Sequence, residues 1–190
     1  MLVASYEAIR FQKLDLFSVM LRQIGAYMQK QLLKDAVNVI IDGDGNENAA
    51  IAYSVGRSPI SGTSGKLEYN QLVEFWAQFD PYTMNTLLCS TPTMTAMLKI
   101  PELQNPLTGL NFQGTGKLST PLGAQLCRSS VVDDNVIIGL DNRYALEQVR
   151  AGDVMVEFDK IIDRQLERAA ISTISGFAKI CDGASCVLNV

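Results

Sequence analysis

One long stretch of helical periodicity, from about Glu7 to Gly45, constrains this chain more than any other feature. Apolar residues recur there at steps of three or four, which places them on one helix face; they are Phe17, Leu21, Ile24, Met28 and Leu32. The Asp42-Gly43-Asp44-Gly45 run ends it, because glycine enters the left-handed region without a Cβ clash. A helix of about 30 residues is roughly 45 Å long. We expect a spine helix that carries two sheet-containing lobes.

The composition favours association between copies of the chain. Its 190 residues suit one large domain or two small ones. Hydrophobic residues make up 47% and charged residues 19%, whereas about 25% is usual for charged residues in soluble domains. A chain with so little charge tends to bury surface against partners, which favours a homo-oligomer.

The charge and hydropathy patterns argue against several classes of function. The net charge of −4 and the pI of about 4.8 argue against a basic face that grips nucleic acid. No apolar run approaches the ~20 residues of a membrane span. The first residues, MLVASYEAIRFQK, lack the order of a secretory signal.

Histidine is absent, which removes the commonest general base and the commonest zinc ligand. The four cysteines form no CxxC pair, and we expect thiols in a reducing compartment. A small disulfide loop between Cys181 and Cys186 is the alternative. Cys89 and Cys127 have no histidine to activate them as nucleophiles.

Three further motifs predict no site. Asp42, Asp44, Asn46 and Asn48 alternate like calcium ligands, but Glu47 stands where such a loop needs glycine and Tyr53 where it needs glutamate; a polar helix-ending turn is expected instead. The Gly65-Lys66 and Gly116-Lys117 pairs lack the other P-loop residues. Acidic residues between 133 and 163 are interleaved with basic ones, which indicates solvated faces and ion pairs between subunits. We therefore predict no catalytic, cofactor-binding or metal-binding residues, and no cofactor.

Shorter elements follow the predicted spine. Strands are expected at 48–55, 84–89, 123–129, 135–140 and 153–158, and the tail 171–190 reads as strands joined by an Asp182-Gly183 turn. Helices are expected at 66–79, with Trp76 packed, and after Ser90-Thr91-Pro92, where a hydroxyl cap precedes proline. Residues 142–149 read as a helix or turn, 159–170 as partly helical, and 105–119 as a polar loop.

The order of these elements resembles the major capsid proteins of tailed bacteriophages. The resemblance rests on the helix exit LLKDAVNVIIDGDGN, the strand and proline-led helix TLLCSTPTMTAMLKI, the pair STPLGAQLCRSS and NVIIGLDNRYAL, and the ending VEFDKIIDRQLERAAISTISGFAKICDGASCVL. Gly43, Asp44 and Gly45 match the bend after the family's spine helix. Family members are usually longer before the spine.

The resemblance implies a mixed α/β (α+β) fold with a peripheral and an axial lobe. Residues 1–60 and 153–190 would form the peripheral lobe, and residues 61–152 the axial lobe with its central sheet. It implies a structural virion protein, not an enzyme, made in the bacterial cytoplasm. Copies would assemble into hexamers and pentamers of an icosahedral shell that encloses DNA without sequence-specific binding, with scaffolding or portal proteins as further partners and no membrane.

Two alternatives stay open. One is the shell protein of a bacterial encapsulating nanocompartment with the same fold. The other is a histidine-free small-molecule enzyme or binding protein, which predicts a concave pocket lined by converging carboxylates.

Overall fold

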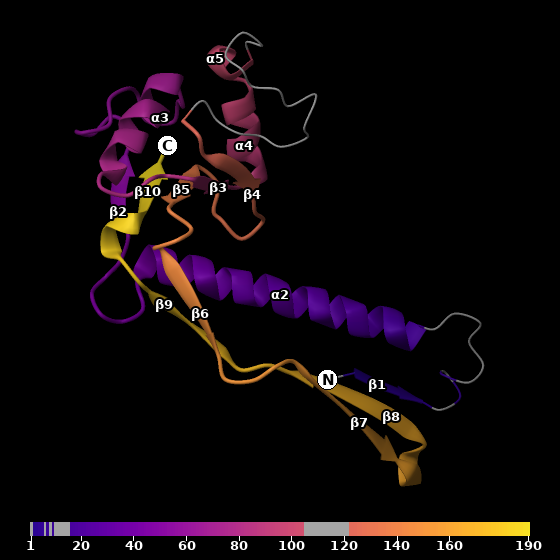
Figure 1. The fold of residues 1–190 in the computed structure, drawn as a ribbon. Coiled ribbons are helices and arrows are strands. Elements are labelled where there is room, and N and C mark those ends of the chain that lie inside the picture. Colours follow the sequence, from indigo (N-terminus) through magenta and orange to yellow (C-terminus); the bar gives the residue numbers. More distant parts are fainter. Residues whose placement is uncertain (1, 6, 8, 10–15, 105–121) are drawn as a thin grey trace. The chain divides into compact units, whose positions relative to one another are not determined.

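The computed structural model describes residues 2–5, 7, 9, 16–104 and 122–190 (Figure 1). Its helical elements are α2 (Leu16–Asp42), α3 (Tyr69–Trp76), η1 (Ala77–Phe79), α4 (Thr91–Leu98), α5 (Pro101–Gln104), η3 (Ile162–Arg164) and η4 (Asp182–Ala184). Its strands are β1 (Leu2–Ser5), β2 (Ile51–Ser54), β3 (Thr86–Cys89), β4 (Gln125–Arg128), β5 (Val136–Leu140), β6 (Leu146–Arg150), β7 (Met155–Ile161), β8 (Leu166–Ser172), β9 (Ser175–Lys179) and β10 (Ser185–Asn189). The mixed α/β class is confirmed.

The long helix α2 is continuous over 27 residues, as the periodicity predicts. Leu21, Ile24, Met28 and Leu32 of the expected stripe are half-buried along it. At about 100° per residue, Val37 and Ile40 fall on the other side of the helix, and both are buried. The helix therefore buries one side in its first part and another side near its end. It stops at Gly43, whose N–H donates to the Val39 carbonyl and whose φ is +87°.

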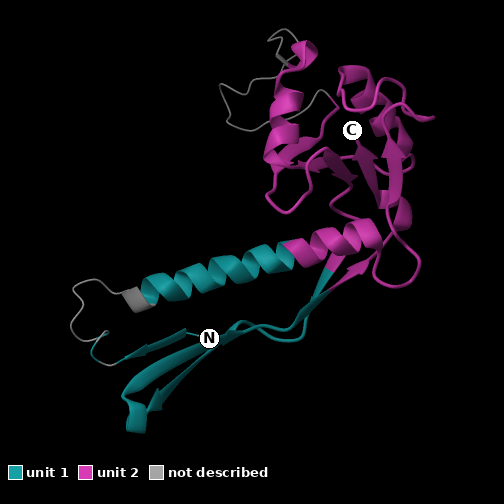
Figure 2. Ribbon diagram, turned by 180° about the vertical axis from the view of Figure 1, so that it is seen from behind, with its two compact units in different colours: residues 1–33, 148–176 teal, residues 34–147, 177–190 magenta. Residues whose placement is uncertain are grey.

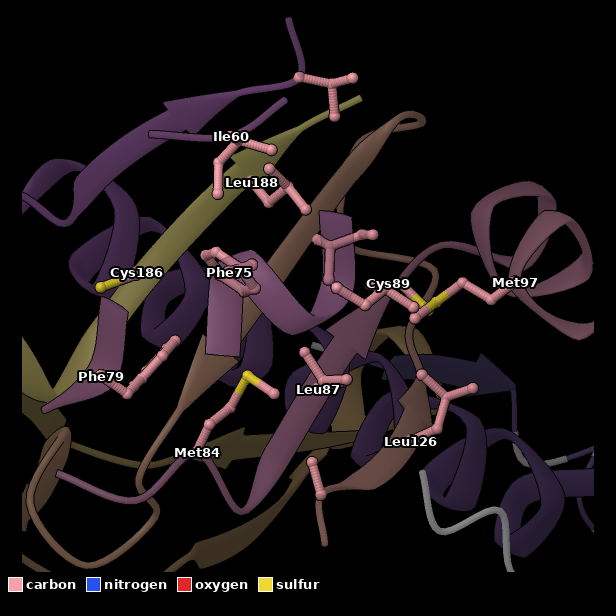
Figure 3. Packing of buried hydrophobic residues seen from close by; sticks show 14 of the residues in the cluster. Ile60, Phe75, Phe79, Met84, Leu87, Cys89, Met97, Leu126, Cys186 and Leu188 are labelled. Atoms are coloured by element: carbon pink, nitrogen blue, oxygen red, sulfur yellow. The ribbon is translucent and has the colours of Figure 1, made fainter. Parts of the chain in front are cut away.

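The largest sheet has five strands in the order β2-β10-β5-β3-β4, with hydrophobic clusters on both faces. Successive residues of a strand point to opposite faces, and β5 shows this, since Ile137 joins one cluster and Ile138 the other. Phe75 and Phe79 pack edge to face, with ring centroids 5.4 Å apart, over the first face (Figure 3). Val37 and Ile40 of α2 belong to the cluster on the second face. The sheet is thus covered on both sides and carries the main core.

Helix α4 begins as the sequence predicts. Ser90 is its N-cap, and the Ser90 hydroxyl accepts a 3.5 Å hydrogen bond from the Thr93 N–H, with Pro92 in the first turn. The prediction for 66–79 is confirmed by α3 and η1, except that Trp76 is 43% exposed rather than packed. Phe75 and Phe79 take the buried positions, and at helical spacing this turns Trp76 outward.

The expectation of partly helical structure in 159–170 is wrong except for the short turn η3, because strands occupy the rest. Residues 155–172 form the hairpin β7–β8, in which Asp159 pairs with Arg168 and Lys160 with Glu167 in the antiparallel register. Opposite charges face each other across the strands, which is consistent with this register. The strand β1, which was not anticipated, pairs with β8. Residues 142–149 form a turn followed by β6, and the expected loop 105–119 lies outside the described residues.

The chain divides into two compact units (Figure 2). Unit 1 comprises residues 1–33 and 148–176, and unit 2 comprises residues 34–147 and 177–190. These boundaries differ from the expected lobes 1–60, 61–152 and 153–190. Because β2 and β10 lie in one sheet with β3, β4 and β5, residues near 51–54 and 185–189 group with the middle of the chain.

Candidate functional site

The sheet of unit 1 has an apolar face that is buried at one edge and exposed at the other. Its strand order is β1-β8-β7, and Leu2, Ala169 and Phe158 stand opposite one another across the three strands. Paired residues share a face. Leu2 is 5% exposed and Ala169 1% exposed, whereas Phe158 on the outer strand is 66% exposed.

The exposed part of this face continues along β7. Val156 and Phe158 alternate along β7 and share a side; Val156 is 45% exposed, and Val154, just before the strand, is 56% exposed. We call these three residues the β7 strip. The turn that follows carries Ile162, which is 81% exposed at the tip of the hairpin. On this face the Lys160–Glu167 ion pair lies between Phe158 and Ile162, so the apolar surface is interrupted before the tip.

Four charged side chains of the hairpin form two ion pairs within the sheet. Arg168 donates to the Asp159 carboxylate, with an Nε–Oδ2 distance of 2.7 Å, and the Lys160 ammonium lies 3.1 Å from the Glu167 carboxylate. These pairs are exposed and contribute little to stability. The two ion pairs do not cover the apolar side chains of the β7 strip, which are largely exposed.

Unit 1 buries little of its apolar surface. Among its described residues, the buried hydrophobic side chains are Leu2 and Ala169. Its large exposed hydrophobic residues, beyond the β7 strip and Ile162, are Val3, Ile9, Val19, Met20, Tyr27, Leu33, Val149, Met155 and Ile174. Of these, the exposed residues along β7 share one strand, so they are the candidate interaction surface of unit 1.

Unit 2, by contrast, has a buried polar network that fixes the corner after β5. Both carboxylate oxygens of Asp141 accept bonds from the Arg143 guanidinium, at 3.0 and 2.9 Å, and others come from the Thr83 N–H and the Asn85 amide. Asp141 is fully buried. The hydrogen bonds from Arg143 hold the pKa of the Asp141 carboxyl well below its usual range, against the opposing effect of burial.

A second polar cluster in unit 2 lies at the end of α2. The Lys179 ammonium donates to the Asn48 carbonyl at 2.6 Å and lies 3.5 Å from the Ile40 carbonyl. A cation near the last carbonyls of a helix is favourable, although burial lowers the pKa of Lys179. Asp44 accepts bonds from Asn46 and from the Lys179 N–H. The polar turn expected at 42–48 is therefore built from hydrogen bonds.

The described residues bring no metal-ligand set together. No group of three or more His, Cys, Asp and Glu in that part of the chain is placed to hold a metal ion. The four cysteines are free thiols, so the alternative Cys181–Cys186 disulfide is not formed. Burial raises the pKa values of Cys89 and Cys186 to about 11, which keeps both protonated and unreactive at neutral pH.

A depression of about 380 Å³ lies beside the start of α3 and the α4–α5 segment. Its charged lining residues are Lys66, Glu68, Lys99 and Glu102, and Lys66 pairs with Glu68 at 2.7 Å. The two carboxylates are matched by two lysines. The converging carboxylates that the enzyme alternative predicts do not occur in this depression.

The sequence predicted the strand that carries the apolar surface, but neither its partner strand nor the exposure of its apolar side. The alternation in 153–158 indicated a strand, but the pattern gave no partner for it. The signal for the hairpin was the mirrored charge order of Asp159-Lys160 and Glu167-Arg168. That order places opposite charges face to face only if the chain turns back between them.

The comparisons with known proteins give a family match and a set of structures with the same fold. A family model described as phage capsid protein matches residues 1–158. A search of curated proteins gives no match. The structure of the capsid of a native GTA particle superposes with a TM-score of 0.71 at 14% identity, covering 100% of this chain and 70% of that one.

Two further solved structures share the fold. A structure of Mycobacterium phage Che8 matches with a TM-score of 0.70 and 11% identity, over 99% of this chain and 68% of that one. The SrpI encapsulin of Synechococcus elongatus PCC 7942 matches with a TM-score of 0.66 and 14% identity, over 98% and 70%. At these identities the similarities establish the fold. Among the described residues, none of the helices has both the length and the apolar character needed to cross a membrane.

Proposed function

This chain belongs to the phage capsid protein family, and on that premise we propose that it is the major capsid subunit of a phage or prophage shell. Copies assemble into hexamers and pentamers of an icosahedral lattice that encloses DNA. The observation that carries the proposal is the apolar face of the unit 1 sheet, which is buried at Leu2 and Ala169 and open to solvent at Phe158. A neighbouring copy covers the open part.

General magnitudes indicate what such a contact requires. A stable interface buries about 800 Å² on each partner, and each Å² of apolar surface contributes about 25 cal/mol. The β7 strip and Ile162 supply the apolar centre of such a contact. A heterologous contact of this kind closes into a ring when the rotation between copies allows it.

The two units have separate parts in this proposal. Unit 1, with its small core and open apolar face, acts as the peripheral lobe, and unit 2, with its own core on both sheet faces, acts as the axial lobe. The subunit is made in the bacterial cytoplasm, and scaffolding and portal proteins assist its assembly. The net charge of −4 suits a wall that encloses DNA without sequence-specific contacts.

The test is a single substitution on the β7 strip. Val156→Asp leaves the fold intact, because the Val156 side chain is already 45% exposed. It places a carboxylate in the contact between copies, so the concentration needed for assembly should rise at least about 10-fold, equivalent to 1.4 kcal/mol. Negative-stain microscopy and light scattering of the full chain over a concentration series measure this.

The matched control is Ile180→Asp in unit 2, where the original side chain is 48% exposed. It should assemble like the unchanged protein. Equal assembly of the two variants would contradict the role of the β7 strip, and an unchanged protein that stays monomeric under all assembly conditions would contradict the shell function itself.

A nanocompartment shell is the second candidate, favoured by the fold shared with the SrpI encapsulin. Shells purified from cells discriminate the two. Packaged DNA together with neighbouring portal and terminase genes indicates a phage shell, whereas an encapsulated enzyme indicates a nanocompartment.

A further inference from the structure

The first two thirds of α2 carry positive charge and no negative charge. Arg22, Lys30 and Lys34 are its charged residues between Leu16 and Lys34. At about 100° per residue, the three fall within roughly 120° of the helix circumference. The acidic residues of the helix, Asp35 and Asp42, lie toward the opposite side.

These three cations are exposed and uncompensated. In the part of the chain that the structure describes, none of them forms an ion pair, whereas Lys66, Arg143, Lys160 and Arg168 each pair with a carboxylate. Other exposed cations, such as Arg57, Lys99 and Arg128, also lack an ion pair, but the three on α2 share one helix sector that holds no acidic residue. It fits a partner that is itself a polyanion.

The net charge of −4 argues against a basic chain as a whole, but the row on α2 is a local feature, and we propose that this basic face of α2 binds the phosphate backbone of nucleic acid inside the shell. The proposal rests on the proposed function, which supplies DNA as the enclosed polyanion. At 1.5 Å per residue, the three cations are spaced by about 12 and 6 Å along the helix, a row that spans about five base pairs at 3.4 Å each. The exposed Gln23 amide lies within the same sector and adds a hydrogen-bond donor.

The contact carries no sequence information. Lysine and arginine contacts to phosphate position a protein on DNA, whereas base edges give specificity. Three phosphate contacts predict that log K falls with log salt at a slope of about −2.7. Between 50 and 200 mM salt the affinity of a subunit for duplex DNA should therefore fall roughly 40-fold.

The experiment measures binding of a labelled duplex DNA to unassembled full-length subunits by fluorescence anisotropy over a salt series. The variant combines Arg22→Gln, Lys30→Gln and Lys34→Gln. The control combines Arg57→Gln, Lys99→Gln and Arg128→Gln, three exposed cations of unit 2, and so removes the same charge. The α2 variant should lose most of the affinity and nearly all of the salt slope, and the control should keep both.

Equal binding by the two variants would overturn the proposal, because overall charge alone would then explain the affinity. A polyglutamate peptide that binds as tightly as DNA, with the same slope, would also overturn it in favour of an acidic protein segment. Electron microscopy of the same proteins, transferred to assembly conditions, separates this result from the proposed function. Shells that form normally while the α2 variant still binds DNA refute the contact alone, and a failure of the unchanged chain to form shells refutes the function.

Discussion

Asp141 shows how one polar side chain fixes a corner of the five-stranded sheet. Its carboxylate joins the end of β5 to the segment before β3 through Thr83 and Asn85, and Arg143 closes the network from the solvent side. A buried carboxylate without partners is costly. Here the donors surround it, so the carboxylate stabilises the corner as long as it stays ionised.

Asp141→Asn should destabilise the subunit by about 2 kcal/mol, since it loses hydrogen bonds to a charged group, and should lower Tm by roughly 4–8 °C. The difference is pH-dependent. The pKa of Asp141 is held below its usual value, so the unfolded chain takes up this proton first as pH falls, and the stabilisation declines below about pH 4.

Thermal unfolding of the unassembled subunit at pH 7 and across the acid range measures both effects. Asp134→Asn is the control, because Asp134 is exposed. A stability gap between the unchanged protein and Asp141→Asn that stays constant down to pH 2 would contradict this account.

Gly139, in the middle of β5, is required for packing. A Cβ there would lie 2.7 Å from Phe79 Cζ, 2.8 Å from Phe75 Cε1 and 3.0 Å from Met84 Sδ. Gly139→Ala should cost about 1–3 kcal/mol through overpacking. Gly25→Ala in α2 is the matched control, because a Cβ at Gly25 has no neighbour within 4 Å, and it should stabilise the helix by up to about 1 kcal/mol. Urea unfolding gives both values, and opposite signs are expected.

At the scale of elements, the end of α2 depends on backbone conformation and on close packing together. Gly43 and Gly45 have φ values of +87° and +98°. A Cβ on Gly43 would lie 2.6 Å from Asn48 Oδ1 and 2.9 Å from the Ala49 nitrogen, whereas one on Gly45 would meet nothing within 4 Å. The left-handed conformation alone costs a side chain about 1–2 kcal/mol.

Alanine at the two positions separates these effects. Gly45→Ala should lose about 1–2 kcal/mol, and Gly43→Ala should lose clearly more, because the Ala49 backbone must move as well. Chemical unfolding of each variant measures the difference. Equal losses would mean that the turn relaxes freely and does not define the helix end.

The hairpin β7–β8 is the element that most needs neighbours. β7 has a strand partner on one side, two ion pairs lie within the hairpin, and several of its apolar side chains are largely exposed. A few strands without a covered hydrophobic face are marginally stable. We therefore expect the stability of this element to increase on assembly.

At the scale of the whole molecule, the two units should differ in hydrogen exchange. Amides in β5 and β10 should exchange slowly in the free subunit and in shells, since their sheet is buried on both faces. Amides in β7 and β8 should exchange fast in the free subunit and slow by at least about 10-fold in shells. Mass spectrometry of free and assembled protein tests this, and an unchanged rate in the hairpin would argue that no copy covers it.

Much of the local structure was predictable from the sequence, because periodicity and caps act over a few residues. The apolar spacing from Leu21 to Leu32 predicted α2, Gly43 its end, and Ser90 and Pro92 the start of α4. The order of such elements was enough to suggest the capsid family, which the match over residues 1–158 confirms. These signals depend on steric and hydrogen-bonding preferences that each segment carries by itself.

Strand partners and buried faces were decided only by the tertiary structure. β10 pairs in parallel with β2 from the other end of the chain, and β8 pairs with β1 across more than 160 residues, since Leu2 faces Ala169. Trp76 turned outward because Phe75 and Phe79 fill the core. Period-two alternation says that a strand has two faces, but which face is covered depends on long-range packing. The open side of the β7 strip is such a case, and the sequence by itself could not locate it.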